Sequence, residues 1–511
     1  MASDGNGSPS TLTNGSVFAQ VSEQTVPPDH GAYRTLVLCF DGKGDSFDAD
    51  NSNIVQLFSM LKKDDRSKQM VYYQAGIGTY TIPEIATPLM AKVSKAIDMA
   101  VAKDLDAHVM GGYEFLMQNY QANDRICIFG FSRGAYTARA LAGMIHKVGL
   151  LPTCNHQQVP FAYKMFTRDD PVGWKQSNAF KKAFSINVEV YFIGVWDTVA
   201  SVGLIAHRLP FTASNKAVRF FRHAISLDEH RAKFMSNHWQ PSSQEDHNLG
   251  VSDDAMPRSN RLEGPPRVHP EHAFHHHESG AHGKGKLKEA ERMYDSLEAD
   301  ATERHNWETD VLEVYFAGCH CDVGGGSVPN GTRHSLARIP LRWMIRQCFL
   351  AGTGILFHRD AFAEIGLDHS RLCPVVAPRP VAEDGQSMHG RKPTERTLVD
   401  ADAEDAPGKL SEEEEDLRDA LSPIYDELQI SKGWWILEVL PLRHKVHHAV
   451  ERKFTMEWIM NLGRARDIPR HMPLHVHRSV KTRMEAVEDL EGKSLKYTPR
   501  STFSADPIWV D

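Results

Sequence analysis

The sequence lacks an apolar run long enough to cross a bilayer, and it has no excess of basic residues. Its 511 residues are 41% hydrophobic and 24% charged, an ordinary globular composition. The best apolar candidate, residues 434–442, is far shorter than the roughly 20 residues that a membrane-spanning helix needs. The formal net charge of −8 provides no general attraction to nucleic acid. We therefore expect a soluble globular protein that does not bind nucleic acid.

Targeting signals are also absent, and cysteines are few. Residues 1–32 are expected to form a disordered tail, because the segment is rich in Ser, Gly, Asn and Thr. The first Lys or Arg is Arg34, so the basic start of a signal peptide is missing, and Ala2 stands where a myristoylation signal needs glycine. The seven cysteines are scattered and odd in number, which favours reduced thiols and a cytoplasmic location.

Short apolar runs alternate with helical patterns over much of the chain, and this alternation predicts the fold class. The alternation indicates an α/β-hydrolase-like fold, with a mostly parallel sheet flanked by helices. The predicted strands, which are mostly apolar, cover 35–40, 70–74, 125–129, 188–195 and 311–317. The run 35–40 (TLVLCF) is continuous, as in a strand of a parallel sheet that is buried on both faces. The predicted helices cover 53–61, 89–120 and 135–148.

Two polar segments interrupt this pattern and set the expected domain organisation. Residues 33–350 are expected to form the catalytic domain, with 240–305 as a polar surface insertion rich in Pro, Ser, His and Asp. Residues 351–511 are expected to form a helical C-terminal extension that contains an acidic linker at 381–410. A helix is predicted from Ser411, because Glu414 follows it at the spacing of a capping box.

The motif Gly130-Phe131-Ser132-Arg133-Gly134 supplies the first candidate for catalysis. It follows a predicted strand directly and opens a predicted helix, which is the setting of a nucleophile elbow. Such a turn holds the serine in an unfavourable backbone conformation with its hydroxyl exposed, and the flanking glycines avoid Cβ clashes. We predict that Ser132 is the nucleophile of a serine hydrolase; the alternative is an incidental serine in a glycine-lined turn.

A serine nucleophile needs a base, and the base needs an acid that orients it. In α/β-hydrolases the acid and then the histidine follow the nucleophile along the chain, on loops at strand ends. Asp197 follows the fourth predicted strand, and His320 follows the fifth and precedes glycines 324–326, a flexible run that can fold around a ligand. We predict Asp197 as the acid and His320 as the base, with Asp322 and His477 as the respective alternatives.

Acyl transfer also needs backbone N–H groups that stabilise the oxyanion of the tetrahedral intermediate. One is predicted from Arg133, directly after the nucleophile. The other is predicted from the loop that begins at Gly42 and Lys43, for which a plain tight turn is the alternative. Because a protein base and backbone donors suffice for this chemistry, we expect neither a metal nor a cofactor.

Other segments have competing interpretations. The histidines between residues 269 and 282 are more typical of a disordered tract than of a metal site. Cys319 to Asp322 are adjacent at a strand end, where neighbouring side chains point opposite ways, and this disfavours a shared metal. The segment 434–442 (WWILEVLPL) suits contact with a lipid surface, but burial in a helix or strand is the favoured interpretation.

Three segments taken together resemble one known family: 129–139 (FGFSRGAYTAR), 195–203 (VWDTVASVG) and 318–326 (GCHCDVGGG). They resemble the α/β-hydrolase domain of the type VI secretion phospholipase effectors, a family with uncharacterised fungal relatives. The resemblance extends over about residues 33–350, with shorter matches at 40–42, 76–79 and 226–231. It implies a Ser–Asp–His triad, which falls by motif on Ser132, Asp197 and His320, and acyl-ester hydrolysis of phospholipids.

The sequence departs from the family pattern at three positions beside the expected pocket. Lys43, Cys321 and Ser327 stand where the family often has Thr, Ser and an aromatic residue, so the substrate is affected more than the mechanism. The expected function is hydrolysis of an acyl ester, such as a lipid or phospholipid, with peripheral membrane contact. Two other functions remain open: a catalytically inactive binding module, and a phosphatase built on Asp41.

Overall fold

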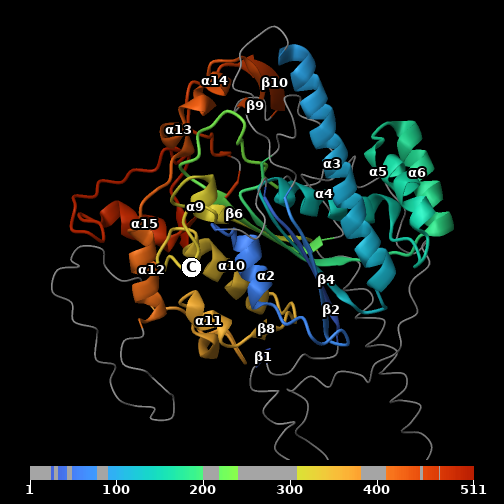
Figure 1. The fold of residues 1–511 in the computed structure, drawn as a ribbon, viewed down its shortest axis with the longest axis horizontal. Helices are drawn as coiled ribbons and strands as arrows, with labels where there is room; N and C mark the ends of the chain where they lie inside the picture. The colour runs from blue at the N-terminus through green and yellow to red at the C-terminus, as the bar shows by residue number, and fades with distance from the viewer. Residues whose placement is uncertain are drawn as a thin grey trace, which may run out of the picture.

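The computed structural model shows one large parallel sheet, which confirms the predicted fold class (Figure 1). The structure describes residues 25–27, 33–42, 49–76, 90–199, 218–239, 308–380, 410–448, 453–470 and 472–511, with the side chains of 90–104, 443–448 and 453–456 left out. The predicted insertion at 240–305, nearly all of the predicted linker and most of the N-terminal tail lie outside these ranges.

Eight strands form the sheet in the order β12-β11-β7-β6-β5-β4-β2-β3, and every neighbouring pair is parallel. The five predicted strands correspond to β2, β3, β4, β5 and β7, with ends within two residues of the prediction. The strands are β2 (Thr35–Phe40), β3 (Gln69–Gln74), β4 (Arg125–Phe131), β5 (Val190–Trp196), β6 (Val218–Ser226), β7 (Asp310–Phe316), β11 (His475–His477) and β12 (Ile508–Val510).

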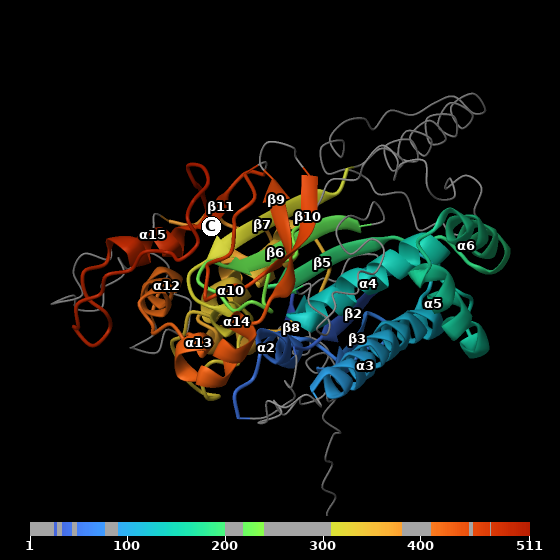
Figure 2. The ribbon, with the colours of Figure 1, turned by 90° about the horizontal axis from the view of Figure 1, so that it is seen from above.

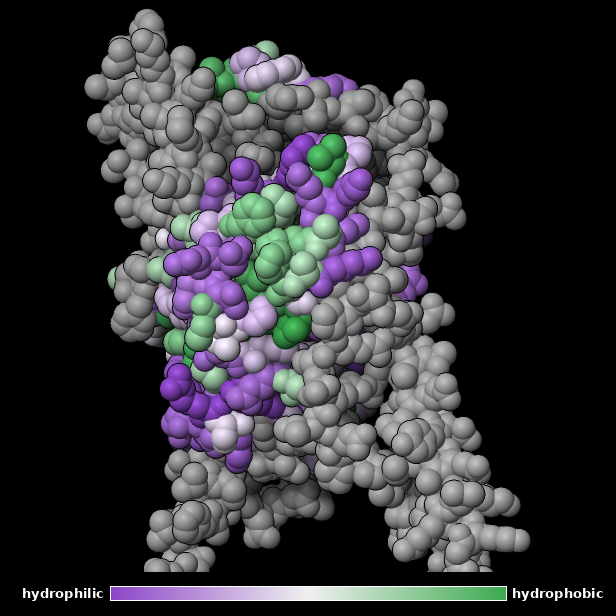
Figure 3. Space-filling model, turned by 90° about the vertical axis from the view of Figure 1, so that its right-hand side faces the viewer, coloured by the Kyte–Doolittle hydropathy of each residue, from purple (hydrophilic) through white to green (hydrophobic). Residues whose placement is uncertain are grey.

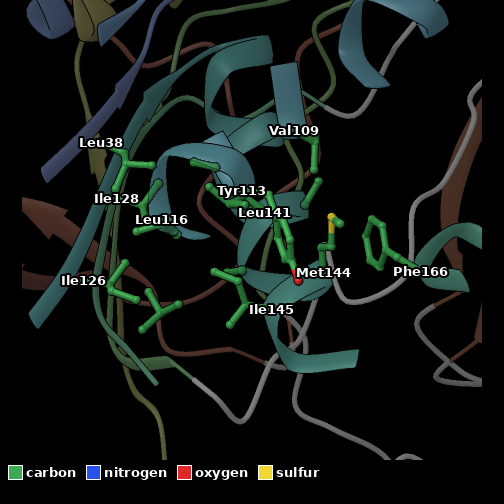
Figure 4. Close-up of a cluster of buried hydrophobic side chains, with 14 of the residues drawn as sticks. Leu38, Val109, Tyr113, Leu116, Ile126, Ile128, Leu141, Met144, Ile145 and Phe166 are labelled. Carbon is green, nitrogen blue, oxygen red and sulfur yellow. The ribbon is translucent and has the colours of Figure 1, made fainter. Parts of the chain in front are cut away.

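Helices cover both faces of the sheet, and each face has its own apolar core (Figure 2). Along β2 the side chains alternate, so that Leu36 and Leu38 enter one core while Val37 and Cys39 enter the other. Figure 4 shows strand residues such as Ile126 facing the helices of the first core. The first face is covered by α3 (Met90–Asn119), α4 (Arg133–Val148), α5 (Val159–Thr167) and α6 (Pro171–Phe184), and the second by α2 (Asn53–Met60) and α10 (Arg338–Leu350).

The C-terminal part of the chain belongs to the same fold, because β11 pairs with β7 and β12 pairs with β11. The helix predicted from Ser411 is confirmed as α12 (Glu412–Ala420), with the capping box between Ser411 and Glu414. Three of its acidic side chains lie against arginines of α10: Arg342 is 2.5 Å from both Asp416 and Asp419, and Arg346 is 2.5 Å from Glu412.

Shorter elements complete the described chain. β1 pairs with β8, and β9 pairs with β10 as an antiparallel hairpin. Their bounds are β1 (Thr25–Val26), β8 (Phe357–His358), β9 (Leu442–His448), β10 (Lys453–Ile459), α9 (His320–Gly324), α11 (Ala361–Glu364), α13 (Glu427–Ile430), α14 (Trp435–Glu438) and α15 (Arg478–Glu485), with 3₁₀ turns at His156–Gln158, His369–Arg371 and Lys432–Trp434.

The surface that carries α5 and α6 shows a group of apolar side chains among hydrophilic ones (Figure 3). Phe161 and Phe184 are about half exposed there, and both rings pack on Phe180.

Within the described part of the chain, no helix combines the length and the apolar composition that crossing a membrane requires. All seven cysteines are free thiols.

Candidate active site

Ser132 lies in a sharp turn where β4 ends and α4 begins. Its backbone has φ 57° and ψ −118°, a conformation that is strained for a residue with a Cβ. The turn fits closely against the end of β2, because a Cβ on Gly134 would come within 2.4 Å of the carbonyl oxygens of Phe40 and Asp41. A Cβ on Gly130 would likewise meet Ala135 at 2.6 Å, so both motif glycines are required by packing.

The strand order explains why this turn lies in a favourable place for a site. The chain leaves β2 toward β3 on one side and then returns to β4 on the other, so the direction of winding changes between β2 and β4. Ligand sites of open parallel sheets form at such switch points, outside the carboxyl ends of the strands. Ser132 follows the carboxyl end of β4 at this point.

The structure brings Ser132, Asp197 and His320 into one chain of hydrogen bonds. Ser132 Oγ lies 2.8 Å from His320 Nε2, and His320 Nδ1 lies 2.5 Å from Asp197 Oδ2. Asp197 directly follows β5 with φ 37°, and His320 is the first residue of α9, just beyond β7. The three residues are 5%, 0% and 3% exposed, respectively, so their hydrogen bonds are shielded from water.

Two aromatic rings and one acidic side chain fix the position of His320. The imidazole lies 4.7 Å from the ring of Phe131 and 4.8 Å from that of Phe234, the second in an edge-on arrangement. Its backbone N–H donates to Glu229 Oε2 at 3.2 Å, and Arg231 binds both oxygens of Glu229. The segment 226–231, which resembles the effector family, therefore supports the base directly.

The electrostatic surroundings favour a neutral histidine beside a charged aspartate. Burial lowers the pKa of His320, and the hydrogen bond and charge of Asp197 only partly oppose this effect. Burial acts to raise the pKa of Asp197, but the charge of Arg466 and the hydrogen bonds from His320 and Arg466 hold it well below its usual range. At neutral pH the arrangement therefore presents a base that is ready to take a proton.

Arg466 is a residue of the site that the sequence analysis missed. It lies in the segment between β10 and β11, and its guanidinium binds both carboxylate oxygens of Asp197, at 2.6 and 2.9 Å. Because 269 positions separate the two residues, no motif spacing relates them. Its surroundings in the sequence, RARDIPR, contain several charges and give no signal that this arginine is buried.

The predicted oxyanion donors are placed only in part. Arg133 is the first residue of α4, so its backbone N–H lies at the positive end of that helix. The N–H of Gly42 donates to the carboxylate of Asp41 at 2.8 Å, while Lys43 lies outside the described residues. Asp41 also accepts from Ser52 Oγ and Tyr73 Oη, so its carboxylate ties together the ends of three segments.

The alternative acid and base do not take part in the Ser132 chain of hydrogen bonds. Asp322 Oδ2 accepts from the N–H groups of Cys319 and Tyr425, and burial raises the pKa of Asp322 to about 7. His477 lies in β11, with Nδ1 2.8 Å from Ser479 Oγ and the ring stacked on Phe316. Burial lowers the pKa of His477 to about 3.

The glycine run after His320 has a packing role that differs from the expected flexible ligand loop. A Cβ on Gly324 would meet the ring of Phe131 at 1.8 Å. Gly325 has φ 86°, and a Cβ there would come within 2.4 Å of the backbone of Asn53. These glycines let α9 pack against the turn at Phe131 and the start of α2, which fixes His320.

Among the described residues no group of His, Cys, Asp and Glu side chains is arranged to hold a metal ion, and the histidines between 269 and 282 lie outside them.

The expectation that residues 434–442 are buried was wrong for most of the segment. The segment forms a 3₁₀ turn, α14 and the start of β9, with large apolar side chains on the surface. The segment is anchored instead by its polar residue Glu438, which is buried and accepts from the N–H groups of Ala232 and Gly463. We name this surface the apolar rim; its members are 39% to 61% exposed and are Ile430, Trp435, Ile436, Val439, Leu440 and Leu462.

The apolar rim lies next to the candidate site. The ring of Trp434 packs edge-on against Phe234 at 5.5 Å, and Phe234 packs against His320. The N–H of Leu462 donates to the carbonyl of Glu438, which joins the two segments that form the rim. A continuous row of aromatic rings therefore runs from this surface to the imidazole.

Sequence and structure comparisons give several proteins to which this chain is similar. Over 546 aligned positions the chain is 28% identical to the uncharacterized protein YEL023C of Saccharomyces cerevisiae, covering 88% of this chain and 79% of that protein. An uncharacterized protein from Pseudomonas aeruginosa gives a TM-score of 0.33 at 16% identity, over 66% of this chain and 50% of that one. This chain thus spans about half the length of that structure.

A second solved structure, the Tle1 effector bound to the VgrG spike from the Type 6 secretion system, gives a TM-score of 0.28 at 17% identity, over 67% of this chain and 77% of that chain. A family model also matches residues 34–347, which is more than half of the chain. That model describes the catalytic domain of Tle1-like phospholipase effectors of the type VI secretion system, T6SS. The chain therefore belongs to the family of T6SS Tle1-like phospholipase effectors through its catalytic domain.

Proposed function

We propose that this protein is a serine hydrolase that cleaves acyl esters with Ser132 as nucleophile, His320 as base and Asp197 as acid. The observation that carries the proposal is the continuous chain of hydrogen bonds from Ser132 Oγ through His320 to Asp197. The strained turn at Ser132 supports it, because such a backbone conformation persists only where packing enforces it. Membership of a phospholipase family points to the same reaction.

The proposed reaction begins when Ser132 Oγ attacks the ester carbonyl carbon and its proton passes to His320 Nε2. Asp197 accepts from Nδ1–H and stabilises the imidazolium that forms. The tetrahedral intermediate collapses as His320 returns the proton to the leaving alcohol, and an acyl-enzyme remains. Water then attacks the acyl carbon with His320 again as base, which releases the acid and restores Ser132.

The oxyanion of each tetrahedral intermediate needs N–H donors beside Ser132. We assign one donor to the backbone of Arg133, because it follows the nucleophile and starts α4. The loop after β2 is the proposed source of the second. In the structure the N–H of Gly42 is bound to Asp41, so the donation proposed for Gly42 requires a local rotation, and Lys43 is the other candidate.

The proposed substrate is an ester with a long acyl chain, such as a phospholipid. The apolar rim supports this substrate class, since exposed Trp435, Ile436 and Val439 would insert into the boundary between head groups and acyl chains of a membrane. The packing of Trp434 on Phe234, which in turn packs on His320, supports a contact close to the base. We therefore propose peripheral membrane contact through the rim during hydrolysis.

A series of p-nitrophenyl esters from acetyl to palmitoyl tests the substrate class. Each methylene buried in an acyl pocket contributes about 0.8 kcal/mol, so kcat/KM should rise by roughly fourfold per methylene at best until the pocket is full. Phospholipid vesicles should then be hydrolysed with release of fatty acid. A profile that is flat or falls beyond acetyl would argue for a small polar ester instead.

A further inference from the structure

Arg466 makes an unusually complete contact with the acid of the proposed site. Its side chain is buried, and Nη1 and Nη2 donate to Oδ1 and Oδ2 of Asp197 at 2.6 and 2.9 Å. This paired geometry matches the planar fork of a guanidinium to the two oxygens of a carboxylate. A lysine could bind only as a point charge, so the contact fixes orientation as well as charge.

The other contacts of Asp197 show why its orientation matters. Oδ2 also faces His320 Nδ1, and Oδ1 accepts the backbone N–H of Ser226 at 3.1 Å. Without Arg466 one partner would remain on each oxygen, and the carboxylate could turn about its terminal bond. A change in that angle would move the imidazole relative to Ser132, and misplacement of about 1 Å can cost roughly 100-fold in rate.

The same guanidinium also contacts the backbone of Phe234, whose ring packs against the imidazole. Arg466 Nε donates to the backbone carbonyl of Phe234 at 2.7 Å, and Nη2 donates to the same oxygen. The ring of Phe234 packs edge-on against His320 at 4.8 Å. One side chain thus links the acid and the aromatic wall that together hold the base.

We propose that Arg466 is a positioning residue for the acyl-transfer reaction, and that it locks Asp197 and Phe234 around His320. The proposal rests on the function proposed above. It gives the segment between β10 and β11, which lies outside the matched residues 34–347, a direct effect on the reaction.

Charge adds a measurable signature to this role. The ionisable groups that face His320 are two carboxylates, Asp197 and Glu229, and the cation Arg231, while Arg466 neutralises Asp197 from the far side. Removal of Arg466 would leave the carboxylates less compensated and would favour the imidazolium. The acid limb of the pH profile of kcat/KM should then move to higher pH, by about one unit.

The test compares Arg466→Met and Arg466→Lys with the wild type on p-nitrophenyl butyrate, a soluble ester that does not require a membrane. Arg466→Met should lower kcat by roughly 10- to 100-fold, with KM nearly constant and the acid limb raised. Arg466→Lys loses the paired geometry, so it should lower kcat. Because it keeps the charge, the acid limb of the pH profile should stay in place. The matched control is Arg222→Met, because Arg222 is also buried and binds both oxygens of an aspartate, Asp310, at the start of β7. It should reduce stability without a change in the pH profile.

The outcomes separate this proposal from the function on which it rests. A wild-type protein that neither hydrolyses the ester nor reacts with a fluorophosphonate probe overturns the proposed function itself. Suppose that the wild type is active. If the acid limb does not move in folded Arg466→Met, or if it moves equally in Arg222→Met, Arg466 has a merely structural role and this proposal is overturned. Should Arg466→Met fail to fold, Arg466→Lys decides: a lower kcat at constant KM supports the role, and wild-type kcat contradicts it.

Discussion

Two regions of the molecule contribute to the candidate site in different ways. Residues 34–347 supply the groups proposed to react, Ser132, Asp197 and His320, each at the carboxyl end of a strand or just beyond it. In the part of 410–511 that the structure describes, no residue is proposed to react, yet Arg466 holds Asp197, and the N–H of Tyr425 donates to Asp322 in the helix that carries His320. The C-terminal region therefore holds residues of the site in position, while the groups proposed to react come from residues 34–347.

A pair of histidines makes the comparison concrete. His320 and His477 are both buried, and burial lowers the pKa of each. His320 lies between a serine hydroxyl and a carboxylate, whereas His477 contacts Ser479 and stacks on Phe316. The difference in partners, and not in residue type or burial, decides which of them is suited to proton transfer.

The largest expected effect is the difference in activity between alanine variants of these two histidines. His320→Ala should lower kcat/KM by about 10⁴-fold, because it removes the proposed base, while His477→Ala should keep most of the activity. The second variant should instead lower the free energy of unfolding by about 1–3 kcal/mol, through lost packing against Phe316. Ester hydrolysis and urea unfolding of both variants give the comparison.

Non-additivity provides the control for this prediction. The double variant Ser132→Ala/His320→Ala should be little worse than either single variant, because the groups act as one unit. If His477→Ala lost activity while folded, and His320→Ala kept it, the base would have to be reassigned to the C-terminal region.

A smaller effect is expected where the C-terminal region meets lipid. Changing Trp435, Ile436 and Val439 to serine together should reduce hydrolysis of phospholipid vesicles by roughly tenfold or more, since each buried apolar side chain contributes about 1.5–3 kcal/mol when fully buried. Hydrolysis of p-nitrophenyl butyrate should not change. The matched control replaces Phe161, Val172 and Phe184, which are similarly exposed on α5 and α6.

Equal losses in the rim variant and in the α5–α6 control would mean that vesicle binding does not distinguish the two surfaces. Loss of butyrate hydrolysis in the rim variant would show damage to the site itself. Either result would contradict the assignment of membrane contact to the apolar rim.

The smallest effect concerns Asp322, which links the two regions. Burial raises its folded pKa to about 7, so the folded protein keeps a proton that the unfolded chain loses near pH 4. Stability contributed by this group is present at low pH and is lost as pH rises toward 7. The free energy of unfolding should therefore decrease less between about pH 4 and pH 7 in Asp322→Asn than in the wild type. The difference between the two decreases should be about 1–3 kcal/mol, measured by urea unfolding.

Activity of Asp322→Asn also separates the two candidate acids. Asp197→Asn should lower kcat by about 10⁴-fold, since it disturbs the histidine tautomer, and Asp322→Asn should remain within about tenfold of the wild type. Unchanged pH dependence in Asp322→Asn would show that this carboxyl does not hold a proton in the folded state.

The sequence allowed prediction of those parts of the fold whose signal is local. β2 is a continuous apolar run, β4 is apolar after Arg125, and Ser132 follows β4 in a motif that defines its own turn. β6 (VRFFRHAIS) was missed because Arg219, Arg222 and His223 interrupt its apolar pattern. β11 and β12 are three residues each, too short for periodicity to be visible.

The supporting residues of the site were harder to predict, for a different reason. The contact between Arg466 and Asp197 depends on how residues 453–477 return to the sheet, which no local pattern encodes. The exposure of Trp435 likewise depends on how its segment packs on the rest of the fold, and the apolar sequence alone favoured burial. Glycines 324–326 were expected to be flexible, whereas close contacts with Phe131 and Asn53 hold Gly324 and Gly325 in place.

The most direct test of the central proposal is covalent labelling of the wild-type chain by a fluorophosphonate probe, with the adduct located by mass spectrometry. The probe reacts with a serine only when a neighbouring base activates it. The account predicts a single adduct on Ser132, lost in Ser132→Ala and strongly reduced in His320→Ala, with thermal midpoints close to that of the wild type. A folded wild-type protein that shows no adduct on Ser132, or an adduct that persists in His320→Ala, would contradict it.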